Sequence, residues 1–355
     1  MIGRRAVLAT LAASALPLGA CQQRASNARV GVIAPLTGEG ATYGASMRRG
    51  IELAFGDSSG VQLIFEDDKL SAQDGVAAIN KLISVDDVDL LYGSAASGVT
   101  TAIVPIADRN QKVLLSSIST ADDLTDASRY FFRNVPKNAF QGSTAATYLQ
   151  RRGGIERIAI FGENDDYGVN LAESFKQAAQ QAGMQIVYES AYLGSDTDFR
   201  TQLTRIKSSG AQAVFVPGNY EETGIILRQA AELRTSALFI GGDGSYSPTL
   251  LSYAGPAAEG FVCTIMSVDR TTEMYRAFAE AFRTAHNADP DVYDTYAYEA
   301  GLILRQVLER GRADPRAYLA ATTFDTFAGP LAFQGSDMIR PYGVTVVRNG
   351  QFVDQ

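Results

Sequence analysis

The chain has little of the chemistry that most catalytic and metal sites require. Its 355 residues include two cysteines, Cys21 and Cys263, and one histidine, His286. Zinc sites built from Cys and His, and proton relays with more than one His, are therefore excluded. Lys and Arg total 31 against 39 Asp and Glu, a net charge of −8, and no basic run occurs. This balance argues against nucleic acid as a partner, since a phosphate backbone demands concentrated positive charge.

Apolar runs long enough to cross a bilayer are also missing from the N-terminus. The run over residues 6–18 is too short for a transmembrane helix but has the length of a secretory signal core, and it follows Arg4 and Arg5. It ends in Leu18-Gly19-Ala20-Cys21, which resembles the bacterial lipobox. We therefore expect a signal peptide over residues 1–20, export, and a lipid attached to Cys21; the alternative is a soluble secreted protein cut nearby. Cys263 would then be the one cysteine of the mature body, unable to form an internal disulfide.

The length and composition predict a folded chain with two cores. A chain of 355 residues exceeds the size at which one core usually stops growing. Hydrophobic residues make up 46% and charged residues 20%, which is typical of globular proteins.

Short apolar runs alternate with amphipathic stretches, and this alternation predicts parallel sheets with helices on both faces. The expected strands are 30–34, 61–65, 89–92, 113–115, 157–161, 185–188, 213–216, 237–240 and 261–265. The expected helices are 43–55, 75–85, 141–152, 170–182, 199–208, 222–233 and 274–286. Four strand–helix units precede residue 119 and four more follow residue 157, which indicates two doubly wound halves.

The segments that follow these strands are unusually polar. In open parallel sheets a ligand lies beyond the carboxyl ends of the strands, so these segments are where a site is expected. They are 35–43, 93–98, 116–120, 162–168, 217–220 and 241–246. One of them contains the adjacent acids Asp165 and Asp166, which we expect to form a solvated face.

Several motifs, in these segments and elsewhere in the chain, are typical of one family. They include Gly31-Val-Ile-Ala-Pro-Leu-Thr-Gly38, Gly93-Ser-Ala-Ala-Ser-Gly98, Tyr130-Phe-Phe-Arg133, Tyr167-Gly168, Gly241-Gly-Asp-Gly244 and Tyr298-Glu-Ala300. In this order, over residues 29–355, the chain resembles type I periplasmic binding proteins of the leucine/isoleucine/valine-binding family. These proteins capture ligands for ABC importers.

The resemblance implies an α/β fold of two Rossmann-like lobes with parallel sheets, joined by a hinge of three crossovers. Lobe one would comprise residues 28–139 and 267–328, and lobe two residues 140–266 and 329–355. It also implies a monomer that binds a small molecule in the cleft and presents it to the permease subunits of an ABC transporter. No catalytic turnover, cofactor or metal is expected.

Two of the expected site residues have chemistry that can be read from the sequence. Ser97 opens a helix, so its hydroxyl and the free N–H groups beside it can meet an anion, although an N-cap is the alternative role. Asp243 lies among glycines, and a buried acid there needs a cation; an Asx turn is the alternative.

The resemblance assigns roles to these and further residues. Ser97 and Thr120, with the carbonyl of Ile118, would hold the carboxylate and ammonium of an amino acid, and Asp243 would bind the ammonium. The pocket for the side chain would be shaped by Tyr43, Tyr167, Asn219, Tyr220 and Tyr293.

We therefore expect a lipid-anchored periplasmic binding protein for an amino acid, branched-chain or similar. Three alternatives stay open: a binder of amides or urea, a binder of aromatic acids, and an envelope scaffold lipoprotein that activates cell-wall synthases without a ligand. The sequence does not decide which amino acid fits.

Overall fold

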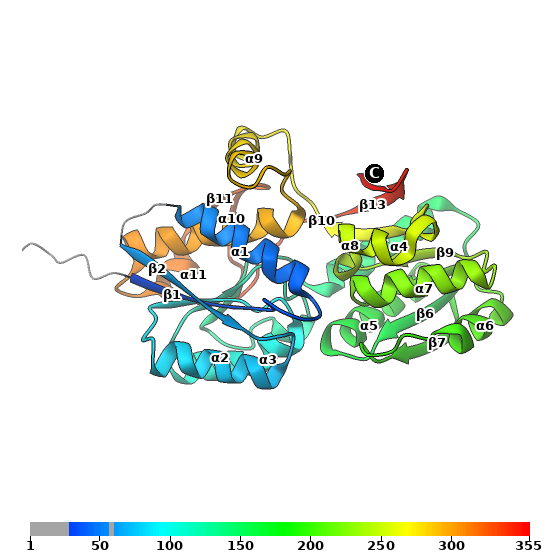
Figure 1. Ribbon diagram of the computed structural model, residues 1–355, viewed down its shortest axis with the longest axis horizontal. Helices are drawn as coiled ribbons and strands as arrows, with labels where there is room; N and C mark the ends of the chain where they lie inside the picture. Colours follow the sequence, from blue (N-terminus) through cyan, green and yellow to red (C-terminus); the bar gives the residue numbers. More distant parts are fainter. Residues whose placement is uncertain (1–27, 57–59) are drawn as a thin grey trace, which may run out of the picture.

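The chain builds two α/β halves that lie side by side (Figure 1). The structure is a computed structural model and describes residues 28–56 and 60–355. The predicted signal peptide and Cys21 lie outside the described residues.

The first half contains a parallel sheet in the order β2-β1-β3-β4-β5. Its strands are β1 (Ala28–Ala34), β2 (Val61–Asp67), β3 (Leu90–Tyr92), β4 (Leu114–Ser116) and β5 (Phe131–Arg133). One face is covered by α1 (Ala41–Phe55) and α10 (Val292–Gln306), the other by α2 (Ala72–Ser84) and α3 (Ser97–Arg109). Helices α1 and α10 approach so closely that a Cβ on Gly50 would lie 2.4 Å from the backbone oxygen of Asp294.

The second half contains a sheet in the order β14-β13-β10-β9-β8-β6-β7. Its strands are β6 (Arg157–Glu163), β7 (Gln185–Tyr192), β8 (Ala213–Val216), β9 (Leu238–Gly241), β10 (Val262–Met266), β13 (Tyr342–Arg348) and β14 (Gln351–Asp354). Helices α4 (Asn138–Arg152) and α5 (Asp166–Gln181) cover one face, while α6 (Arg200–Ser209), α7 (Tyr220–Glu232) and α8 (Pro248–Ala254) cover the other.

This second sheet corrects the expectation of purely parallel sheets. Strand β13 runs antiparallel to β10, and β14 runs antiparallel to β13. Both strands come from the last residues of the chain, where the sequence has no strand–helix repeat. Strand β10 also contains Cys263, which is fully buried, and burial raises the pKa of its thiol well above the usual value.

The chain crosses between the halves three times: after β5, after β10, and before β13. Between the last two crossings lie α9 (Glu273–His286), α10, α11 (Pro315–Ala321) and the hairpin of β11 (Thr323–Thr326) and β12 (Gly329–Ala332).

Two buried ion pairs attach the segment between β12 and β13 to the first half. The guanidinium of Arg133 lies 2.7 Å from Asp337, and that of Arg340 lies 2.7 Å from Glu299 in α10. The lobe boundaries stay a proposal, and these contacts favour ending lobe one near residue 340 rather than at 328.

None of the helices among the described residues is long and apolar enough to span a membrane.

Candidate ligand-binding site

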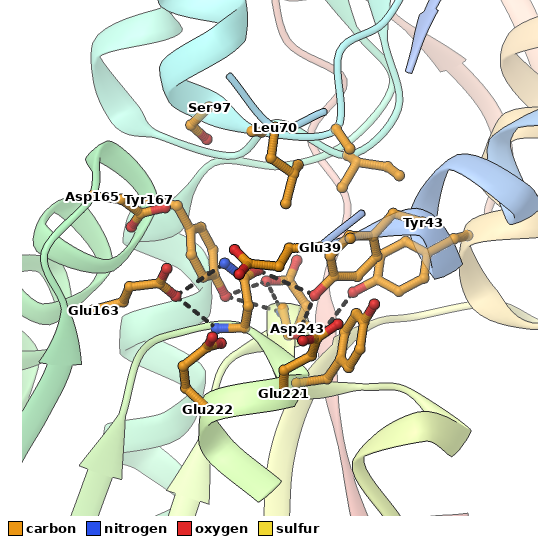
Figure 2. Close-up of a pocket in the computed structure, with 18 residues that line it drawn as sticks. Glu39, Tyr43, Leu70, Ser97, Glu163, Asp165, Tyr167, Glu221, Glu222 and Asp243 are labelled. Atoms are coloured by element: carbon orange, nitrogen blue, oxygen red, sulfur yellow. Dashed lines mark hydrogen bonds between the residues drawn. The ribbon is translucent and has the colours of Figure 1, made fainter. Parts of the chain in front are cut away.

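A cavity of about 190 Å³ lies between the two halves, at the carboxyl ends of their central strands. Figure 2 shows side chains from both halves pointing toward one another across it. The first half contributes Glu39, Gly40, Tyr43, Leu70, Ala95, Ala96, Ser97, Ile118 and Tyr293 to its wall. The second half contributes Glu163, Asp165, Tyr167, Asn219, Tyr220, Glu221, Glu222, Asp243 and Gly244.

One side of the cavity is formed by the start of α3. Ser97 is the first residue of this helix, and Ala96 takes the N-cap position without a side-chain cap. The first N–H groups of a helix have no partner within it and lie at the positive end of the dipole. The Ser97 hydroxyl accepts a 3.2 Å hydrogen bond from the Ala121 N–H, so its own proton stays available to donate. This side of the cavity can therefore bind an anion.

The opposite side holds Asp243, which follows β9 and is only 2% exposed. Its Oδ1 accepts hydrogen bonds from Tyr167 Oη at 2.7 Å, Gln141 Nε2 at 2.8 Å and the Gly244 N–H at 3.0 Å. Tyr342 Oη donates to Oδ2 at 3.3 Å. All four donors are neutral, and burial raises the pKa of Asp243 although these hydrogen bonds oppose the shift. The carboxylate is thus held in one orientation, and no cationic side chain of the described residues neutralises it.

Tyrosines line the cavity between these two sides and connect the halves. Tyr43 of α1 packs edge-on against Tyr220 at 5.1 Å and against Tyr293 at 5.2 Å between ring centroids. Its hydroxyl donates to the backbone oxygen of Gly244 in the second half. The Tyr293 hydroxyl donates to the backbone oxygen of Asp243 at 2.5 Å. Both halves therefore contact each other around the cavity.

Six acids stand in the wall, and no Lys, Arg or His of the described part of the chain joins them. Glu163 ends β6 and accepts hydrogen bonds from the backbone N–H and the side-chain amide of Asn219 at 3.0 and 2.9 Å. Burial raises its pKa, and the charges of Asp165 and Glu222 add to the effect. Burial also raises the pKa of Glu222 to about 7, with Glu221, Glu39 and Asp165 contributing. The wall of the cavity is therefore rich in acids, and their raised pKa values show that negative charge there is costly while no cation is bound.

The structure brings together eight of the nine residues expected in the ligand site. Thr120 is the exception, because it does not belong to the wall. Its backbone oxygen accepts a hydrogen bond from the Asn138 N–H at the start of α4, and its buried hydroxyl has no partner among the described residues.

The acids Glu163, Glu221, Glu222 and Asp165 were not identified from the sequence as site residues. The expectation of a solvated face holds for Asp166, which is exposed. It does not hold for Asp165, which is half-buried: its carboxylate caps α5 by accepting from the Gly168 N–H at 2.7 Å, and burial raises its pKa. The available signal was position alone, since Glu163 ends β6, Asp165 follows it, and Glu221 and Glu222 lie in the first turn of α7, the helix that follows β8.

No group of His, Cys, Asp and Glu in residues 28–56 and 60–355 is arranged to hold a metal ion.

Two α/β halves, crossovers between them and a cavity enclosed at their strand ends define a two-lobed solute-binding protein. The periplasmic binding protein family model matches residues 27–351. The chain belongs to this family, in the type I group of Leu/Ile/Val-binding proteins. The family is one of binding proteins, and membership implies an extracytoplasmic location, a small-molecule ligand and an ABC transporter permease as partner.

Named relatives agree with this assignment. The chain is 27% identical over 336 residues to the leucine-, isoleucine-, valine-, threonine- and alanine-binding protein of Pseudomonas aeruginosa, covering 91% of this chain and 90% of the relative. It is 30% identical over 302 residues to a Leu/Ile/Val-binding protein of Rhizobium johnstonii, covering 82% of each.

Solved structures share the fold. A leucine binding protein of Thermotoga maritima superimposes with a TM-score of 0.88 at 24% identity, covering 92% of this chain and 97% of the other. A solute binding protein of an ABC transporter from R. palustris, in complex with benzoate, gives a TM-score of 0.84 at 21% identity, with 92% and 94% covered.

Proposed function

We propose that the protein captures an amino acid in the cavity between its lobes and delivers it to an ABC permease. The observation that carries this proposal is the pairing of opposite electrostatic sites across one cavity. The start of α3 on one side can bind a carboxylate, and Asp243 on the other side is a buried acid without a cation among the described residues of the wall. A zwitterion satisfies both at once.

The relatives' names support the same class of ligand, since both curated relatives described above are named for amino acids that include leucine. The aromatic-acid alternative is less suited to this wall. A benzoate carboxylate would gain from a cationic side chain, and the described residues of the wall offer six acids and no base.

The amide alternative leaves Asp243 unpaired, because a neutral ligand brings no positive charge to it. The scaffold alternative would need no ligand and would tolerate a blocked cavity.

A thermal-shift screen of the purified protein against amino acids, amides and aromatic acids tests the proposal. A ligand at 100 times its dissociation constant adds about 2.7 kcal/mol to the free energy of unfolding, which raises the melting temperature measurably. We expect amino acids to give the largest shifts. A shift produced by benzoate or amides alone would refute the proposal, and so would no shift from any compound together with normal cell-wall activity of a cavity-blocked variant.

We also propose that the protein is held at a membrane by a lipid on Cys21, within residues that precede the described fold. The lipobox-like sequence at residues 18–21 supports this, and the polar segment over residues 22–27 would connect the lipid to β1.

A further inference from the structure

The cavity contains more negative charge than a single ammonium group requires. Asp243 is sufficient to pair with the ammonium of an amino acid, and it is held in place by neutral donors. Glu163 and Glu222 stand on another part of the wall, on β6 and α7, as Figure 2 shows. Their charge therefore needs an explanation of its own.

Glu222 lacks the partner that its position on the helix normally provides. It is the third residue of α7, from which a Glu side chain usually reaches back to the backbone N–H of the N-cap residue. Here the N-cap is Asn219, and its N–H donates to Glu163 instead. Glu222 is 6% exposed, and its carboxylate accepts a hydrogen bond from its own backbone N–H. No other described residue donates to it or forms an ion pair with it, so nothing in this part of the wall balances its charge. A buried carboxylate in a cavity wall without a partner of opposite charge points to a group that arrives from outside.

Glu163 lies close enough to Glu222 for the charge of Glu222 to raise the pKa of Glu163, after the larger effect of burial. One edge of its carboxylate is occupied by Asn219, through two hydrogen bonds to the same oxygen, Oε2. The other oxygen, Oε1, lies beside Gly194 and accepts no hydrogen bond from the described residues, so it can still accept one. The amide of Asn219 also fixes this carboxylate relative to α7, so the two acids form a preorganised pair.

We infer that the ligand is an amino acid with a cationic side chain, whose second positive charge binds between Glu163 and Glu222. This inference rests on the proposed function and narrows its substrate class: a diamino or guanidino acid rather than an aliphatic one. The α-ammonium pairs with Asp243, the carboxylate with the start of α3, and the side-chain cation with the two glutamates. Each charged group of the ligand then has a partner of opposite sign.

The charged groups that face this pair among the described residues are all carboxylic acids, and the neutral hydroxyls of Tyr192 and Tyr43 also lie in range of both glutamates. Glu221 belongs to α7, Asp165 to the start of α5 and Glu39 to the loop before α1. Burial and the neighbouring acids raise the pKa of Glu222 to about 7 and that of Glu163 to about 8, so without a cation both acids bind protons more readily than exposed glutamates do. A cation favours the ionised form, so binding should release protons.

Isothermal titration calorimetry with lysine, arginine, leucine and 1,4-diaminobutane tests the inference. We expect lysine or arginine to bind at least about tenfold more tightly than leucine at pH 7. Repeating the titration in buffers of different ionisation enthalpy should reveal more protons released on binding the cationic amino acid than on binding leucine, whose single ammonium pairs with Asp243 alone.

Two variants and one control identify the residues responsible. Glu222→Gln and Glu163→Gln should each reduce the affinity for the cationic amino acid at least tenfold and leave the affinity for leucine within about threefold. The Glu163→Gln variant keeps a side-chain oxygen that can accept from Asn219, and melting curves of both unliganded variants would verify folding. Glu280→Gln removes an exposed acid of α9 that has no ion pair among the described residues, and should change neither affinity.

The outcomes separate the two proposals. Leucine binding as tightly as lysine and arginine, with no loss in either variant, would overturn the cationic ligand and leave amino-acid capture standing. Diaminobutane binding as tightly as lysine would show that the carboxylate is dispensable, which would overturn amino-acid capture and leave the second cation site standing. Binding of benzoate alone would overturn both.

Discussion

The substitution Asp243→Asn separates the charge of the cavity from its shape. The three hydrogen bonds to Oδ1, from Tyr167, Gln141 and the Gly244 N–H, can all be kept by the amide oxygen of asparagine. On the other side, Tyr342 Oη lies 3.3 Å from Oδ2 and also 3.3 Å from the backbone oxygen of Pro136, so it retains an acceptor when an NH₂ group replaces Oδ2. The wall keeps its geometry and loses one negative charge.

The expected loss of affinity follows from leaving an ammonium group without its counter-ion. Truncating one partner of a buried, hydrogen-bonded charge pair costs about 2–5 kcal/mol, which corresponds to a fall in affinity of roughly 30-fold to several thousand-fold. Asp243 is 2% exposed, so water replaces little of the lost interaction and the upper part of this range is accessible.

Although Asp243→Asn should weaken ligand binding, it should not lower the stability of the unliganded protein. Burial raises the pKa of Asp243 in the folded state, so its ionised form opposes folding at pH 7. An acid whose pKa is higher in the folded than in the unfolded state adds to the free energy of unfolding at low pH. This contribution is lost as the pH rises through the folded-state pKa. Asparagine avoids the buried charge, and the melting temperature of the empty variant at pH 7 should equal or exceed that of the wild type.

Calorimetry with the best ligand from the screen, alongside thermal melts, measures both quantities. Glu280→Gln serves again as the control for removing one negative charge outside the cavity. Binding by Asp243→Asn within threefold of the wild type would refute the pairing of Asp243 with an ammonium. A melting temperature lowered by several degrees would mean instead that the variant disturbs the wall, and the affinity would then be measured with Asp243→Ser as a second variant.

Four further predictions concern other parts of the protein. Ser97→Ala should reduce ligand affinity by about 1–2 kcal/mol, less than Asp243→Asn, because the N–H groups at the start of α3 remain; calorimetry showing no loss would exclude a hydroxyl contact. Tyr43→Phe removes a hydroxyl that connects the halves, so affinity should fall by about 0.5–1.5 kcal/mol, and small-angle scattering of the liganded variant should give a larger radius of gyration than the wild type. Arg133→Met leaves Asp337 buried without its partner and should lower the free energy of unfolding by about 3–5 kcal/mol in urea titrations, whereas a loss below about 1 kcal/mol would contradict the importance of this pair. Cys21→Ser should release the protein from membranes into the soluble fraction without changing its melting temperature; a wild type that is already soluble and unlipidated would contradict the anchor.

Much of the fold was predictable because the strand signals are local. The expected strand over residues 213–216 matches β8, and the expected helix over residues 43–55 begins two residues inside α1. Continuously apolar runs of this kind are typical of strands buried on both faces, and they indicate a parallel sheet without any knowledge of neighbours. The antiparallel strands β13 and β14 were missed because no helix separates them, so the strand–helix pattern is absent. The place of β13 in the sheet also depends on its partner β10, about 80 residues away in sequence, and β14 pairs in turn with β13.

The candidate site was predictable in location and only partly in chemistry. The rule that ligands bind beyond the carboxyl ends of parallel strands located Ser97, Asp243 and the tyrosines. It did not reveal the buried acids, because an acid after a strand looks the same in sequence whether it faces solvent or a cavity. What buries Glu163 and Glu222 is the pairing of β6 with β8, which brings the two strand ends together. That proximity is a property of the sheet order rather than of either segment.

The order in which the chain visits the two halves has a consequence for its biosynthesis. The first half lacks α10 until residue 306 has been made, and β10 keeps an unpaired edge until β13 is available at residues 342–348. A chain emerging from the N-terminus therefore completes neither core until nearly all of it exists, and its contacts join residues distant in sequence, which slows folding. A chain with this order of contacts completes its fold late in its synthesis, and an incompletely folded chain is the form that a narrow channel can admit.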